Sequence, residues 1–108
     1  MNKTIFITGA TSGFGKATAI KFAANNFNLI LNGRRTDRLQ QLKEELEQQY
    51  KINILLLPFD VQNRKEVFEA IESLPNEWKK IDILYNNAGL ALGRDYFEEA
   101  AILMTGKP

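Results

Sequence analysis

The stretch Thr8-Gly9-Ala10-Thr11-Ser12-Gly13-Phe14-Gly15 decides the fold of this chain of 108 residues. It lies between a short β-branched and aromatic segment, residues 3–8, and a segment, residues 14–26, whose apolar side chains recur near helical spacing. A strand, a glycine-rich turn and a helix in this order bring backbone N–H groups and the positive end of a helix dipole toward a bound phosphate. Thr11 and Ser12 add hydroxyl donors. We therefore predict a nucleotide-phosphate site made by consecutive residues: Gly9, Ala10, Thr11, Ser12, Gly13, Phe14 and Gly15.

Two other phosphate-binding loops fit these residues less well. The nucleoside-triphosphate loop needs Gly, four residues and then Gly-Lys-Ser/Thr. Here its first glycine falls on Ala10, and its hydroxyl residue, a magnesium ligand, falls on Ala17. The common dinucleotide fingerprint Gly-x-Gly-x-x-Gly is also absent, since the glycines are Gly9, Gly13 and Gly15. The order Gly-x-x-x-Gly-x-Gly is therefore a distinct variant.

The rest of the chain alternates between strand-like and helix-like segments. Further strands are predicted at residues 28–33, 52–59 and 81–85, where aliphatic runs fit burial on both faces of a sheet. Helices are predicted at residues 64–74 and from Thr36 or Asp37, either of which can cap the N-terminus. This order predicts an α/β fold, a Rossmann-type doubly wound parallel sheet in three layers, incomplete at about four strands and three helices.

The apolar spacing also predicts which side chains pack. The expected stripes of the three helices are Phe14, Ala17, Ile20, Ala24 and Phe27; Leu39, Leu42 and Leu46; and Val67, Ala70, Ile71 and Leu74. Three further aromatic residues are assigned to packing rather than to a ligand cage: Phe59, Trp78 and Tyr85.

The composition is that of a single soluble globular domain. Hydrophobic residues make up 44% and charged residues 25% of the chain, and the formal net charge is +1. The absence of cysteine and histidine excludes disulfides, the usual zinc sites and imidazole acid–base chemistry, and no metal ligand is predicted. No apolar run suits a membrane span or a secretory signal, so we expect a cytoplasmic protein without a membrane partner.

Positive charge is concentrated in the first third of the chain. Residues 1–38 hold six basic side chains and one acid, whereas the remainder holds eight basic side chains and twelve acids. This local excess suits a small polyanionic ligand, and the whole chain is not basic enough to suggest a nucleic acid. An uneven scatter by chance is the alternative.

Two motifs resemble the fingerprints of the short-chain dehydrogenase/reductase family. The first is Thr-Gly-x-x-x-Gly-x-Gly at residues 8–15, and the second is Asn86-Asn87-Ala88-Gly89 after the fourth predicted strand. Asp60-Val61, closing the third strand, resembles the family's adenine-contacting pair. The resemblance covers residues 1 to about 100, and residues 73–78 and 88–93 are further similar to an NADP-dependent 3-hydroxy acid (serine/allo-threonine) dehydrogenase subgroup. It implies an oxidoreductase that transfers hydride between NADP(H) and an alcohol or carbonyl.

The resemblance also implies a role for each matched residue. Three groups would surround the cofactor: residues 9–15 at the pyrophosphate, Asp60 and Val61 at the adenine, and Asn87, Ala88 and Gly89 at the ribose. Asn86 would link neighbouring strands. Without the resemblance, Asp60 could merely end a strand or cap a helix, and residues 86–89 could be a strand-ending turn.

The end of the second predicted strand bears on the choice between NAD and NADP. An acid at this place accepts hydrogen bonds from the ribose 2′-hydroxyl, whereas an arginine pairs with a 2′-phosphate. The chain has Arg34 and Arg35 there, and Asp37 fits a helix cap better than a ribose contact. We therefore predict NADP as cofactor over NAD, with a solvated turn as the alternative for the two arginines.

The catalytic residues of the resembled family are not found. Its proton donor is a tyrosine followed four residues later by a lysine, and none of Tyr50, Tyr85 and Tyr96 has a lysine at that spacing. No catalytic residue is therefore assigned, and we expect this chain to be catalytically inactive. We expect residues 1–108 to be the truncated N-terminal, NADP-binding part of one Rossmann-fold domain, without the substrate pocket and most of the subunit interface.

The last residues suggest an origin for such a truncation. Residues 102–108 can be back-translated as ATC TTG ATG ACT GGG AAG CC, and one preceding G shifts this to Asp-Leu-Asp-Asp-Trp-Glu-Ala, which resembles the family's continuation. We hypothesise that the tail from about residue 101 is out of frame. Two alternatives stay open, namely a non-catalytic NADP-binding sensor and an inert gene remnant.

Overall fold

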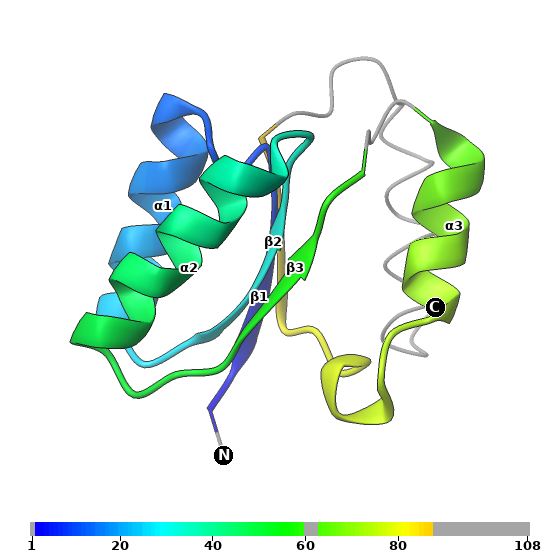
Figure 1. Ribbon diagram of the computed structural model, residues 1–108. Helices are drawn as coiled ribbons and strands as arrows, with labels where there is room; N and C mark the ends of the chain where they lie inside the picture. Colours follow the sequence, from blue (N-terminus) through cyan, green and yellow to red (C-terminus); the bar gives the residue numbers. More distant parts are fainter. Residues whose placement is uncertain (1, 60–62, 88–108) are drawn as a thin grey trace.

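The structure, a computed structural model, describes residues 2–59 and 63–87. Its centre is a sheet of four parallel strands in the order β3-β2-β1-β4. The strands are β1 (Thr4–Thr8), β2 (Asn28–Asn32), β3 (Ile54–Leu57) and β4 (Ile83–Asn86) (Figure 1). Because all four run in one direction, their carboxyl ends meet at one edge of the sheet, where Thr8 lies beside Asn86.

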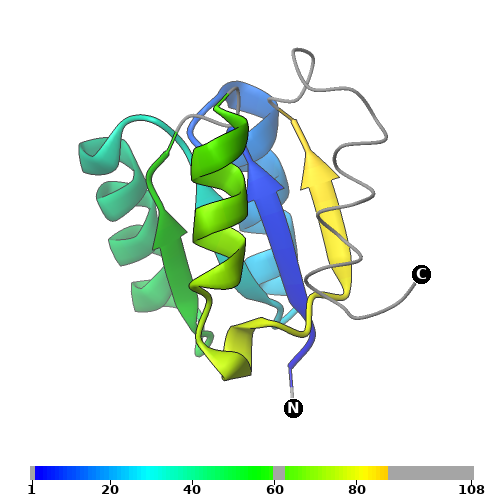
Figure 2. The same ribbon diagram turned by 90° about the vertical axis from the view of Figure 1, so that its right-hand side faces the viewer.

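Helices cover both faces of this sheet. α1 (Gly13–Ala24) and α2 (Thr36–Gln49) lie side by side on one face, and α3 (Arg64–Glu72) lies on the other (Figure 1). A short 3₁₀ helix, η1 (Asn76–Trp78), leads from α3 toward the amino end of β4 (Figure 2). The predicted three-layer, Rossmann-type α/β fold is confirmed. None of the helices in the described residues has the length and apolar character that a membrane crossing requires.

Two apolar clusters fill the space between the sheet and its helices. Ile5 and Ile7 belong to the cluster under α1 and α2, whereas Phe6 belongs to the cluster under α3, because successive side chains of a strand point to opposite faces. Burial confirms the stripe of α2 in full: Leu39, Leu42 and Leu46. Of the stripe predicted for residues 64–74, Val67 and Ile71 are buried in α3, and Leu74 is buried just after the helix ends at Glu72. Ala70 is only half-buried.

The prediction for the apolar face of α1 is wrong for four of its five residues, and only Phe27, which follows the helix, packs against the cluster under α1 and α2. Phe14 is 79% exposed and Ile20 41% exposed, and Ala17 and Ala24 are also exposed. The face that packs on the sheet is made of small residues: Gly15, Ala19 and Ala23. Small side chains let the helix backbone lie close to the strands, which a stripe of large residues would prevent.

The prediction for the cap of α2 is also wrong. The helix begins at Thr36, and its N-cap position is Arg35, which makes no side-chain capping hydrogen bond. Neither Thr36 nor Asp37 therefore caps this helix. Asp37 lies in the first turn, where its negative charge interacts favourably with the helix dipole although it is not the cap.

β4 is more exposed than its apolar composition predicts. Within the described residues β4 pairs only with β1 and is an edge strand of the sheet. Tyr85 is 37% exposed, so its assignment to the core is wrong, whereas Phe59 and Trp78 do pack against the cluster under α3.

Candidate functional site

The glycine turn connects the carboxyl end of β1 to the amino end of α1. Gly9 has a φ of 61°, in the left-handed region that glycine adopts without strain. Its carbonyl oxygen accepts two hydrogen bonds from Ser12, one from the backbone N–H at 3.2 Å and one from Oγ at 2.9 Å. The carbonyl oxygen of Ser12 then accepts from the N–H of Lys16 at 2.8 Å, within the first turn of α1. The turn predicted from the sequence is present and leads directly into a helix.

Gly13 and Gly15 have opposite surroundings. A Cβ atom on Gly15 would collide with the carbonyl oxygen of Gly9, so α1 can lie against the turn only with glycine here. A Cβ atom on Gly13 would meet nothing within 4 Å, so this side of the turn is open. Ser12, the N-cap residue, makes no side-chain capping hydrogen bond. The first N–H groups of α1 therefore keep their capacity to bind an anion.

Two asparagines at the end of β4 join this turn to the sheet. The Nδ2 of Asn87 donates to the Oγ of Ser12 at 2.6 Å and to the carbonyl oxygen of Gly9 at 3.2 Å. Beside them, the Oγ1 of Thr8 donates to the Oδ1 of Asn86 at 3.0 Å. The first motif and the described residues of the second, Asn86 and Asn87, therefore lie in contact, and Asn86 makes the link between strands that was expected of it.

A third asparagine, Asn32, was not predicted from the sequence. Its side chain is 1% exposed. Its Nδ2 donates to the carbonyl oxygens of Leu57 and Phe59, both at 3.0 Å, and its Oδ1 accepts from the N–H of Gly9 at 3.4 Å. Its backbone oxygen accepts from the N–H of Ala10 at 2.8 Å, so Ala10 is a buried part of the turn. The sequence signal was an amide at the end of an otherwise aliphatic strand, since a buried polar group needs partners.

Arg34 and Arg35 lie at the carboxyl end of β2, next to the glycine turn. The link is Gly33, where a Cβ atom would lie 3.3 Å from the Cδ2 of Leu39 and 3.6 Å from the Oγ1 of Thr11. Both arginine side chains are exposed, and neither forms an ion pair with another residue of the described part. Two guanidinium groups are therefore available to a ligand that binds beside the turn.

Of the remaining predicted site residues, Phe14 alone lies in the part of the chain that the structure describes. Phe14 is exposed on the first turn of α1. Four predicted site residues lie outside the described residues: Asp60, Val61, Ala88 and Gly89. The described residues contain no cluster of three His, Cys, Asp or Glu that could hold a metal ion.

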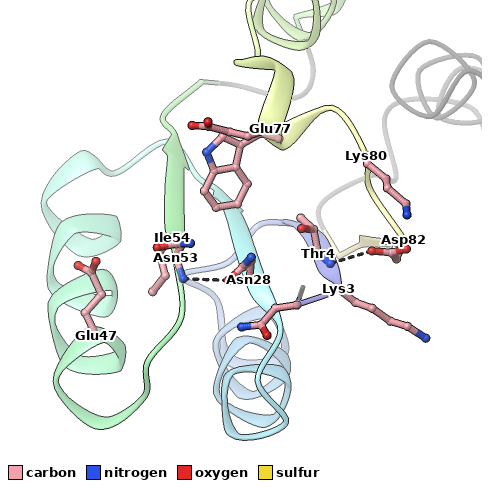
Figure 3. Close-up of a pocket in the computed structure, with 11 residues that line it drawn as sticks. Lys3, Thr4, Asn28, Glu47, Asn53, Ile54, Glu77, Lys80 and Asp82 are labelled. Carbon is pink, nitrogen blue, oxygen red and sulfur yellow. Dashed lines mark hydrogen bonds between the residues drawn. The ribbon is translucent and has the colours of Figure 1, made fainter.

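A cavity lies at the other end of the sheet, where the strands begin. It has a volume of about 860 Å³ and is lined by residues near the amino ends of the strands, among them Ile54 (Figure 3). Two pairs of its polar groups bond to each other: the N–H of Thr4 donates to the Oδ2 of Asp82, and the N–H of Asn53 to the Oδ1 of Asn28, both at 2.9 Å. It contains none of the predicted site residues. Ligands of parallel α/β sheets bind at the carboxyl ends of the strands, so the glycine turn is the candidate site.

The chain resembles known proteins over most of its length. The model of the short chain dehydrogenase family matches residues 3–102. The NADP-dependent 3-hydroxy acid dehydrogenase of Salmonella typhi is 45% identical over 98 residues, which are 91% of this chain and 38% of the relative.

Two solved structures are similar to this chain in fold and in sequence. Serine dehydrogenase from Escherichia coli has a TM-score of 0.68 and 48% identity, covering 83% of this chain and 40% of that one. L-sorbose reductase from Gluconobacter frateurii, solved with NADPH and L-sorbose, has a TM-score of 0.76 and 29% identity, covering 95% of this chain and 44% of that one. The chain therefore spans less than half the length of each of these proteins.

Proposed function

Because the chain belongs to the short-chain dehydrogenase family, we propose that residues 1–108 form the NADP(H)-binding part of an oxidoreductase. The Salmonella relative is named as NADP-dependent, and the sorbose reductase was solved with NADPH. The chain spans 38% of the Salmonella relative, and the residues described here form a candidate site for the cofactor rather than for the substrate.

The observation that carries the proposal is the glycine turn. Gly15 lets α1 lie against the turn, Gly13 leaves a side open, and the N-terminus of α1 carries no side-chain cap. An N–H-rich helix end beside an open glycine fits a pyrophosphate, which needs close backbone donors and no Cβ in the way. We assign residues 9–15 to this part of the cofactor.

The arginines support NADP(H) over NAD(H). Arg34 and Arg35 follow β2 beside the turn and have no ion-pair partner among the described residues. A guanidinium group pairs its N–H donors with phosphate oxygens, which NADP has at the 2′ position and NAD lacks. In this proposal, the other contacts complete the site: Asp60 and Val61 at the adenine, and Asn87, Ala88 and Gly89 at the ribose.

The proposed reaction of the whole enzyme is hydride transfer between NADP(H) and an alcohol or carbonyl, with a 3-hydroxy acid as the substrate class. The cofactor supplies the hydride, and this chain's residues bind and orient it. The 108 residues contain no tyrosine with a lysine four positions later. We therefore propose that they bind cofactor without turning over substrate by themselves. The cytoplasmic location expected from the sequence stays a prediction.

Titration of the 108-residue chain with NADPH and with NADH tests this proposal. We expect saturable binding of NADPH, seen as a change in nicotinamide fluorescence, and binding of NADH weaker by about tenfold or more. We expect no oxidation of NADPH when aldehydes or ketones are added. A chain that melts cooperatively but does not bind NADPH would overturn the proposed cofactor, and steady turnover would overturn the proposed inactivity.

A further inference from the structure

A small cavity lies between α1 and α2, next to the glycine turn. Its volume is about 230 Å³. Six residues line it: Thr11, Lys16, Arg38, Gln41, Leu42 and Glu45. Thr11 belongs to the turn, Lys16 to the first turn of α1 and Arg38 to the first turn of α2. The cavity therefore begins at the same edge of the sheet as the proposed cofactor site.

The part of this cavity nearest the glycine turn is positively charged. Lys16 and Arg38 are exposed, and no ion pair joins either of them to Glu45 or to another described residue. Glu45 lies seven residues after Arg38 in the same helix, about 10 Å further along its axis at about 1.5 Å per residue. The negative charge is thus separated from the two cations along the helix.

Thr11 lines this cavity and also lies beside the segment that carries Arg34 and Arg35. The Oγ1 of Thr11 faces the position of Gly33, where a Cβ atom would lie 3.6 Å from it, and Arg34 and Arg35 follow directly. Arg38 lies three residues after Arg35, about one helical turn further on. A phosphate group held by Arg34 and Arg35 would therefore lie beside the cavity that Lys16 and Arg38 line.

We infer that Lys16 and Arg38 are further specificity-determining residues for the phosphate that distinguishes NADP from NAD. The inference rests on the proposed function. A phosphate monoester carries about −1.5 to −2 charge at neutral pH, so each further cation beside Arg34 and Arg35 strengthens its attraction to the site. Lys16 and Arg38 add positive charge from two helices, and Glu45 opposes it.

Charge-removing variants of the full chain test this inference. Lys16→Gln and Arg38→Gln, singly and together, are compared with Lys21→Gln and Lys43→Gln, which change the same helices outside the cavity. We expect the double variant to bind NADP⁺ about tenfold more weakly and NAD⁺ within about twofold of the unchanged chain. The two control variants should keep the ratio of the two dissociation constants.

A variant that removes a negative charge should change the affinity in the opposite direction. Glu45→Gln removes the opposing charge, so NADP⁺ should bind about twofold more tightly while NAD⁺ binding stays the same. Thermal melts of every variant confirm that the fold is retained. If the double variant weakens NADP⁺ and NAD⁺ equally, or neither, the inference is overturned and the proposed function stands. If the unchanged chain binds neither nucleotide, the proposed function fails and the inference fails with it.

Discussion

Gly13 and Gly15 are the same residue type in one turn, but the structure gives them different tasks. Gly15 makes room for the carbonyl oxygen of Gly9, whereas Gly13 borders open space. The spacing of the glycines predicted a phosphate-binding turn, but it could not separate these tasks, because they depend on where the backbone of Gly9 lies. The two positions therefore allow folding and binding to be tested separately.

Alanine at the two glycines should affect stability unequally. Gly15→Ala should lower the free energy of unfolding by about 1–3 kcal/mol, because its Cβ meets backbone that cannot move aside cheaply. Gly13→Ala should change it by no more than about 0.5 kcal/mol. Urea denaturation of the two variants measures both values. Equal destabilisation would show that the turn packs differently.

A charge at Gly13 should affect binding but not folding. Gly13→Asp places a carboxylate on the open side of the turn, where it would repel a pyrophosphate. We expect NADPH to bind at least about tenfold more weakly, with an unchanged melting temperature. Gly13→Asn, of similar size but without charge, is the matched control and should bind better than the aspartate variant. Similar affinities for both variants would argue against a phosphate at this position.

At the scale of elements, the site depends on how α1 and the strand ends are held. α1 packs on the sheet through Gly15, Ala19 and Ala23, and this brings its N-terminus to the glycine turn. Asn32 fixes the end of β2 to β1 and β3, and Asn87 fixes the end of β4 to the turn. Polar side chains at strand ends thus align the elements that form the site.

The small-residue face of α1 should not tolerate a large side chain. Ala23 is fully buried, so Ala23→Leu should cost about 1–3 kcal/mol of stability by overpacking. Ile20 is 41% exposed, and Ile20→Ala should cost less than about 1 kcal/mol. Denaturant midpoints of the two variants compare these faces. A larger loss of stability for Ile20→Ala than for Ala23→Leu would show that the helix packs through the face predicted from the apolar spacing.

Removal of the Asn32 amide should weaken the whole strand-end arrangement. Asn32→Ala leaves the carbonyl oxygens of Leu57 and Phe59 without this donor, at an expected cost of about 2–3 kcal/mol. Asn53→Ala is the control, because Asn53 is exposed and its bond to Asn28 comes from its backbone N–H, so the change should stay within about 0.5 kcal/mol. Similar losses of stability in the two variants would show that the Asn32 amide does not hold the strand ends together.

At the scale of the whole molecule, local patterns in the sequence predicted the architecture well. Alternating apolar segments predicted the order of strands and helices, and the glycine spacing predicted the turn, because both are set by neighbouring residues. The packing face of α1 and the role of Asn32 could not be predicted in this way. The packing face of α1 depends on how the helix contacts β1 and β2, and the role of Asn32 depends on how the ends of β1, β2 and β3 meet. The order of the elements along the chain reveals neither. The exposure of β4 likewise depends on its place at the end of the described sheet.

The central claim is that the carboxyl ends of the strands, and not the larger cavity at their amino ends, bind NADP(H). An amide NMR spectrum of the isotope-labelled chain, recorded as NADPH is added, tests this most directly. We predict saturable shifts for residues 9–15 and for Arg34 and Arg35, with the amides of Asn28 and Asn53 and the indole of Trp78, the single tryptophan, unchanged. Shifts confined to Asn28, Asn53 and Trp78, or no saturable shift in a folded chain, would contradict the account.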